Sequence, residues 1–237
     1  GAVTVSGAIG TDIGTLTVTN SGGATFSGAV GASGDRVASI VLTATTGTVA
    51  FNDDLYATGI TNTGGTFNLN LFGTTTSVTN SVTFGTSGTV AFGNGSDTLT
   101  FTGGLVHSAG PNSIAGTLAT TNTALTLNSA TAVTTNSSIA AGSGTVTLGA
   151  ATLSDGVTLT LGTGDSGAIT ATSFTGTASG SASNVTFNVT GAVTVSGAIG
   201  TDIGTLTVTN SGGATFSGAV GASGAGNSVA SIVLTAT

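Results

Sequence analysis

Hydrophobic and polar residues alternate along much of this chain with a period of two. The segment NVTFNVTGAVTVSGAI (184–199) shows the pattern best, and TFNLNLFG (66–73), VTLTLG (157–162) and TLTVT (15–19) repeat it. Alternation of β-branched or aromatic residues with Thr or Asn predicts strands that bury one face. No stripe with a helical period accompanies it, so the chain is predicted to be all-β. In 184–199 the expected inward residues are Val185, Phe187, Val189, Val193 and Val195, and the expected outward residues are Thr186, Asn188, Thr190 and Thr194.

The predicted strands are short and end at turn-forming residues. Clusters such as TNSGG (19–23) and TASGSASN (177–184) permit tight turns and positive φ angles. Cutting the chain there gives units such as 1–22 and 168–190, and a recurrence of about 20–25 residues is typical of solenoid coils. We therefore predict a parallel β-helix, or β-solenoid, in which identical positions of successive coils stack into apolar ladders.

One long segment of the chain occurs twice. Residues 1–34 are identical to residues 191–224; Asp35 and Arg36 are then replaced by AGNS (225–228), and VASIVLTAT resumes in both copies. We expect 1–190 to be one full tandem block of stacked coils and 191–237 to begin the next, near-identical block. At a strand spacing of about 4.8 Å, the eight to nine coils of one block would carry the second copy about 40 Å along the axis.

Two other all-β architectures compete with the solenoid at this stage. A 190-residue period also fits two immunoglobulin-like sandwiches of about 95 residues each. Such domains usually contain a core Trp or a Tyr corner, whereas Trp is absent here and Tyr56 is the only Tyr. A flat or trimeric β assembly is the remaining alternative.

The composition excludes several classes of function. Only 4% of residues are charged, Lys and Glu are absent, and Arg36 is the single Arg. One Arg cannot neutralise a series of phosphates, so nucleic-acid binding is not expected. The apolar runs, such as IVL (40–42), are far shorter than the roughly 18 residues of a transmembrane helix. The chain has no Cys for disulfides, and because it does not start with Met we expect residue 1 to be a processed end or the start of an excerpt.

One segment has a weak similarity to a metal-binding motif. GNGSDTLTF (93–101) resembles a single calcium nonapeptide, in which Gly93, Gly95, Asp97 and Leu99 fit and Asn94 shifts the pattern. Calcium in such repeats lies between successive turns, and no adjacent copy is present. Asp97 is therefore only a weak calcium candidate, and a plain Gly-Asp turn is its structural alternative; no other cofactor is expected.

Catalytic candidates are equally sparse. Asp53 and Asp54 are adjacent, so they can cooperate in acid–base chemistry only in a turn, because neighbouring residues of a strand point to opposite faces. His107 has no second His and no Cys for a metal site, and no nucleophile motif surrounds a Ser. We expect the segment 104–116, which contains Pro111, to be a loop or insertion between coils. No catalytic residue is assigned, and an enzyme is not expected.

The texture of GTLTVTNSGGATFSGAV (14–30) resembles the Thr/Gly/Val-rich strand repeats of very large bacterial surface proteins, the autotransporter passengers and filamentous-haemagglutinin-like adhesins. The resemblance is compositional and extends over the whole chain. It implies secretion, a right-handed β-helix, and a role at the cell surface. We therefore expect a non-catalytic, self-associating extracellular fibre, sheath or surface-layer protein. The alternative is the stalk of an adhesin whose binding domain lies outside this sequence.

Overall fold

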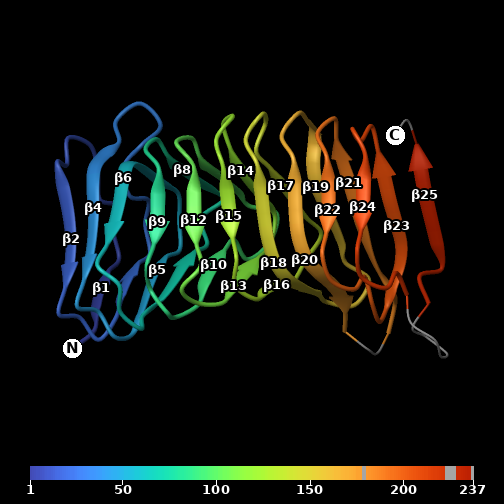
Figure 1. Cartoon of the computed structure of the whole chain (residues 1–237). Coiled ribbons are helices and arrows are strands. Elements are labelled where there is room, and N and C mark those ends of the chain that lie inside the picture. Colours follow the sequence, from blue (N-terminus) through green and yellow to red (C-terminus); the bar gives the residue numbers. More distant parts are fainter. Residues whose placement is uncertain (178–179, 222–227, 236–237) are drawn as a thin grey trace.

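The chain forms one elongated stack of β-coils, seen from end to end in Figure 1. The computed structural model describes residues 1–177, 180–221 and 228–235, and every regular element in them is a strand. The coils average about 21 residues over about ten turns, which confirms the predicted β-solenoid. One sheet of eleven strands runs the length of the stack in the order β2 (Thr15–Thr19), β4 (Val37–Thr43), β6 (Leu55–Asn62), β8 (Thr75–Val78), β11 (Thr98–Phe101), β14 (Thr117–Thr120), β17 (Ser137–Ala140), β19 (Thr158–Asp165), β21 (Ser183–Val189), β23 (Ile203–Thr209) and β25 (Ser231–Thr235).

The second sheet has fourteen strands and consists of two parallel runs. The runs meet in β18 (Val146–Leu153), which bends around a corner of the coil and pairs with β15 through its first half and with β16 through its second. One run is β1 (Val3–Val5), β3 (Ala24–Phe26), β5 (Thr48–Phe51), β7 (Asn68–Leu71), β10 (Val90–Phe92), β13 (Asn112–Ile114) and β16 (Thr131–Val133), and the other is β9 (Val82–Phe84), β12 (Leu105–His107), β15 (Leu125–Leu127), β20 (Ile169–Gly176), β22 (Val193–Val195) and β24 (Ala214–Phe216).

Each coil therefore has three faces, which the chain visits in turn. The coil that starts at β14 continues through β15 and β16 before β17 stacks on β14. We call the face of β14 and β17 face 1, that of β15 face 2, and that of β16 face 3. All strand pairs in the described residues are parallel, which is incompatible with the antiparallel sheets of an immunoglobulin-like sandwich.

The alternating pattern gives the correct inward side chains. Val185, Phe187, Val193 and Val195 are all buried, as predicted, and so is Val189. The outward residues of the same strands are half-buried rather than fully exposed, because side chains on the coils above and below flank them. Across the fold, inward Val, Leu, Ile and Phe form one continuous core along the axis of the stack. Burial of each such side chain stabilises the stack by about 1.5–3 kcal/mol.

Corners of the coils need close backbone approach. A Cβ atom on Gly167 would clash with the carbonyl oxygen of Gly144, one coil below. Asn20 and its counterpart Asn210 both adopt positive φ, at 50° and 58°, just after a strand. Glycine and asparagine accept these conformations at little cost, so the sequence places them where the chain turns between faces.

The two identical segments lie on different faces. Val3 belongs to face 3, because β1 pairs with β3 and this run continues through β10 to β16. Its repeat, Val193, pairs with Ile169 of β20 on face 2. Ile9 is bridged to Val30, and Val30 is bridged to Leu55 of β6, which pairs with β8 on face 1. Its repeat, Ile199, is instead bridged to Phe174 on face 3.

One period of 190 residues thus spans eight and two-thirds coils. On face 3, eight successive strand pairings lead from Val3 to Phe174, and each pairing advances by one coil. The chain then passes through face 1 and reaches Val193 on face 2, which adds two-thirds of a coil. The expected advance of about 40 Å agrees with this number of coils. A pure shift, however, is not enough to superpose the copies: the second copy is also turned about the axis by one face, a third of a turn.

Candidate functional site

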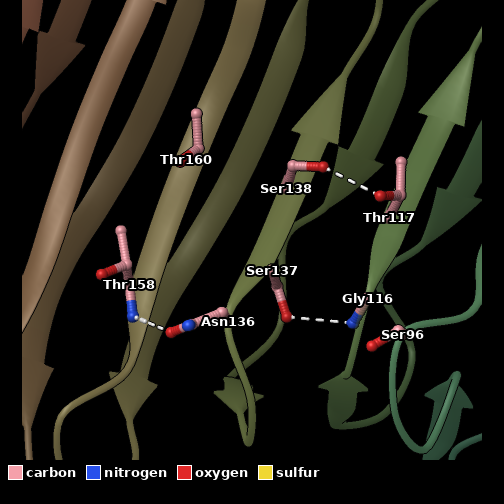
Figure 2. Close-up of a pocket in the computed structure, with 8 residues that line it drawn as sticks. All are labelled: Ser96, Gly116, Thr117, Asn136, Ser137, Ser138, Thr158 and Thr160. Atoms are coloured by element: carbon pink, nitrogen blue, oxygen red, sulfur yellow. Dashed lines mark hydrogen bonds between the residues drawn. The ribbon is translucent and has the colours of Figure 1, made fainter.

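A shallow groove with a volume of about 410 Å³, open to solvent, lies over the ends of strands on face 1. Figure 2 shows its walls, which come from β14, β17 and β19, from the residues just before β14 and β17, and from the turn before β11. Every residue that lines it is Gly, Ser, Thr or Asn: Ser96, Gly116, Thr117, Asn136, Ser137, Ser138, Thr158 and Thr160.

Most polar groups of the groove already bond to one another across coils. Asn136 Oδ1 accepts a hydrogen bond from the Thr158 amide at 2.8 Å, and Ser138 Oγ donates to Thr117 Oγ1 at 3.2 Å. The Gly116 amide donates to Ser137 Oγ at 3.2 Å. Because none of the lining side chains ionises near neutral pH, the groove lacks the means to activate a nucleophile or to transfer protons. It offers hydroxyl and amide groups that can hydrogen-bond to water, a sugar or a neighbouring chain.

Asp97 forms the turn before β11. Its side chain is buried, and Oδ2 accepts a hydrogen bond from the Asn94 amide at 2.8 Å. Gly93 opens the same turn with a φ of 80°. The described residues contain no group of three or more His, Asp, Glu or Cys side chains that could hold a metal ion. The observed geometry is that of a Gly-Asp turn. Among the described residues it brings no further acidic side chains to Asp97 that could bind calcium with it.

Asp53 and Asp54 do lie in a turn, but each carboxylate has a structural partner. Asp53 is exposed and its Oδ1 accepts a hydrogen bond from the amide of Asp54 at 2.8 Å. The Oδ1 atom of Asp54 accepts one from the Thr75 amide on the next coil, also at 2.8 Å. Asp54 thus joins two coils at a corner, and Asp53 stabilises the turn. These contacts do not support acid–base cooperation between the two carboxylates.

His107 is an inward residue of the core, and the prediction that 104–116 forms a loop is wrong. β12 and β13 occupy this segment, and Pro111 falls in the short turn between them. The His107 ring is fully buried, with its Nε2 atom donating to the carbonyl oxygen of Thr86 at 3.1 Å. Its Nδ1 atom lies 2.7 Å from the Asn112 Oδ1 atom. The imidazole fills an inward position of face 2, where one ring nitrogen faces a carbonyl oxygen one coil below and the other faces Asn112 on the adjacent face.

Arg36, the single Arg of the chain, lies on the outer surface of the stack and is held there by hydrogen bonds. Its guanidinium donates to the carbonyl oxygen and the hydroxyl of Ser77 at 2.7 and 2.9 Å, and it lies 5.8 Å from the centre of the Tyr56 ring. These contacts connect successive coils on face 1. The sequence offered no signal for them, since Ser77 is 41 residues away.

The two ends of the stack carry apolar hollows, which alternation alone did not reveal. The N-terminal open end is the outer side of the first coil, where Val3, Val5 and Leu16 line a hollow of about 220 Å³. Among the described strands, β1 and β2 have a partner on one side only, and so do β24 and β25. The C-terminal open end has a hollow of about 340 Å³, lined by Leu206, Gly213, Ala214, Phe216, Val220, Ile232 and Leu234.

In the part of the chain that the structure describes, no helix is long and apolar enough to cross a membrane. Comparison with protein-family models, curated proteins and solved structures gives no match for this chain.

Proposed function

We propose that this chain is the structural repeat region of an extracellular fibre, sheath or surface-layer protein, and that it has no catalytic role. The observation that carries the proposal is the repeat itself: residues 1–34 and 191–224 have the same sequence, and the described strands of both copies belong to one stack. A solenoid adds length whenever a coil is added, because each coil contacts only its neighbours. Tandem duplication therefore extends this fold and adds only one kind of contact, that between the last coil of one block and the first coil of the next.

The polar chemistry of the surface also suits a scaffold. Side-chain oxygens of Asn62, Asn68, Asn122 and Asn136 accept hydrogen bonds from backbone amides about one coil further along, at 2.8–3.1 Å. These side chains satisfy amides at corners, where the sheet ladder is interrupted. With eight acidic residues and one Arg in 237 residues, the fold depends little on ion pairs that salt would screen.

Resistance to proteolysis tests this proposal. The native chain is incubated with trypsin and, separately, with a protease of broad specificity, and the products are weighed by mass spectrometry. Trypsin has one possible site, at Arg36, and both enzymes require local opening of the backbone. We expect the strands to survive both enzymes. Rapid cutting within many strands by the broad protease would contradict a permanent extracellular structure.

The hydroxyl-lined groove on face 1 supports one second candidate. It is an adhesin stalk that itself contacts sugars, in addition to the adhesin stalk whose binding domain lies outside this sequence. A panel of immobilised oligosaccharides separates the two proposals. A pure scaffold binds none of them above background, whereas specific binding that is lost in a Thr158→Val, Thr160→Val double variant would favour the adhesin.

A further inference from the structure

The turn before β11 contains the only Asn-Gly pair of the sequence, Asn94–Gly95. Asn94 is exposed. Its one hydrogen bond among the described residues comes from its backbone amide, which donates to Asp97 Oδ2 at 2.8 Å. This bond fixes the main chain of the turn and leaves the side-chain amide of Asn94 without a protein partner in that part of the structure.

Gly95 leaves its own backbone nitrogen accessible. Apart from its chain neighbours, no heavy atom lies within 4 Å of the position that a Cβ would occupy. Its backbone N–H donates no hydrogen bond within the described residues. In another exposed turn, Gly156 follows Asp155 and donates its N–H to the carbonyl oxygen of Ser181 at 2.7 Å. The nitrogen of Gly95 has no such partner, and Gly presents no side chain that would hinder its approach to Asn94 Cγ.

We propose that Asn94 is a modification site, at which the chain deamidates spontaneously through a succinimide. The Gly95 nitrogen attacks Asn94 Cγ, and the new N–C bond closes the succinimide ring. The Cγ–Nδ2 bond breaks, and Nδ2 leaves as ammonia with the proton from the Gly95 amide. Asn is among the thermolabile residues of proteins, and this reaction needs no enzyme and no oxidant.

Water then opens the ring in one of two ways. Addition of water at Cγ gives Asp at position 94. Addition at the backbone carbonyl carbon of residue 94 gives isoaspartate, in which the main chain runs through Cβ and Cγ. Over both steps one water molecule is consumed and one ammonia molecule is released, and either product carries a new carboxyl group.

Asn136 shows why an exposed Asn does not suffice. It is exposed like Asn94, but its Oδ1 atom accepts a hydrogen bond from the Thr158 amide at 2.8 Å. The residue that follows it, Ser137, has a side chain and is buried at the start of β17. This Asn must first lose its contact with the next coil before its Cγ atom can be attacked, so it is the reference site within the same molecule.

The reaction adds a charge where the fold has few. The formal net charge of the chain is −7, and each conversion makes it more negative by one. The new carboxylate arises three residues from Asp97, whose own carboxylate is buried in the same turn. Like charges this close disfavour one another. Ser96 of this turn also lines the groove of face 1, where no lining side chain ionises, so deamidation places a negative charge at the edge of that groove.

The turn also supports the following coil. The Thr117 amide donates to the carbonyl oxygen of Asp97 at 2.8 Å, and Gly116 approaches Asp97 so closely that a Cβ would clash with the Asp97 backbone. Isoaspartate lengthens the main chain between Gly93 and Asp97 by one methylene, which disturbs this fit. We therefore expect faster amide hydrogen exchange at Thr117 in the isoaspartate form than in the unmodified chain.

Timed peptide mapping tests the proposal. The native chain is kept at mildly alkaline pH and physiological temperature, and samples are then unfolded, digested with a broad-specificity protease and analysed by mass spectrometry. Synthetic peptides with Asn, Asp or isoaspartate at position 94 serve as chromatographic standards. We expect Asn94 to convert at least tenfold faster than Asn136. No conversion of Asn94, or equal rates at the two sites, would overturn the proposal.

Two controls separate the chemistry from the fold. Gly95→Ala is the matched variant, because the added methyl group has space and the backbone is not in the left-handed region. It should slow conversion of Asn94 at least tenfold and leave the protease resistance of the native chain unchanged. The urea-unfolded chain supplies the rate without the turn, and native Asn94 should convert within tenfold of that rate. Slower conversion would mean that the turn protects Asn94, and the proposal would fail while the structural role stands.

Discussion

The two copies of the 34-residue segment have the same sequence and opposite exposures. The first copy is covered on the side toward the C-terminus and open on the other, so Val3 is 50% exposed while Val30 is buried. In the second copy Val193 is buried, and Val220, the repeat of Val30, is 36% exposed. Val3 and Val30 and their repeats are thus fully buried only where a coil lies on each side of them.

The difference shows that a single coil cannot bury its inward side chains by itself. Side chains point toward the axis in every coil, but burial comes from the contact between coils, as nearest-neighbour models of repeat proteins assume. The comparison also shows that neighbours need not be the same in each block. The second copy rests on β20 and β21 after a third of a turn, so inward positions accept different partners provided that these are apolar.

The largest effect is expected from a charge placed at one pair of repeat positions. Val193→Asp puts a carboxylate in the core without a partner and should lower the free energy of unfolding by about 4 kcal/mol. Val3→Asp, the same change at the open end, should cost less than about 1 kcal/mol. Burial raises the pKa of a carboxyl, so the Val193→Asp cost should be smaller at pH 4 than at pH 7. Urea unfolding at both pH values measures these differences, and equal costs at the two positions would contradict the comparison.

Truncation of a leucine should give the next largest difference. Leu42→Ala removes a side chain that is fully buried between two coils and should cost about 2–5 kcal/mol. Leu234→Ala is the same substitution at the repeat position, where the side chain is 63% exposed, and should cost less than about 1 kcal/mol. Amide hydrogen exchange on both variants would show the loss of protection around β4 in the first variant only. Similar losses in both would mean that the last coil is covered.

A smaller effect is expected from a polar contact that the second copy has and the first lacks. Asn184 Oδ1 accepts a hydrogen bond from the Thr205 amide at 3.0 Å, while Thr15, the repeat of Thr205, lies in β2 with no described strand beneath it. Asn184→Ala should cost about 1 kcal/mol. The matched control is Asn188→Ala, whose side chain accepts only an exposed, longer bond of 3.4 Å from Asn210 and should be nearly neutral. The reverse ranking in thermal unfolding would show that the Asn184 contact with the Thr205 amide does not support the stack.

The alternation of residues predicted the strands and the inward side chains, because the pleat of a strand forces successive side chains to opposite faces. The spacing of the turn-forming clusters predicted the coil length. It did not predict on which face a given strand lies. That depends on the cumulative lengths of many turns, and pairing offsets range from 19 residues at Asn112 and Thr131 to 26 at Leu161 and Phe187. The one-face rotation between the copies is the sum of these variations.

The sequence also did not predict which polar residues would lie in the core. His107 was expected in a loop, since a lone His beside Pro111 and several small residues resembles one, but the partners that satisfy it lie on another coil and on another face. Thr76 occupies an inward position between Leu55 and Leu99, and its hydroxyl has no hydrogen-bond partner among the described residues. Asp97, the weak calcium candidate, could be assigned to a Gly-Asp turn from sequence because its partner, Asn94, is local.

Disulfide formation between two engineered pairs tests most directly that the copies lie on different faces. Thr194 pairs with Thr170 on face 2, so a Thr170→Cys, Thr194→Cys variant should form a disulfide on mild oxidation, which requires Cα atoms within about 7 Å. If the second copy were shifted without rotation, Thr194 would instead continue the face 3 line through Thr152 and Thr175. A Thr175→Cys, Thr194→Cys variant should therefore stay reduced under the same conditions. A disulfide in the second variant and none in the first would contradict the rotated stack.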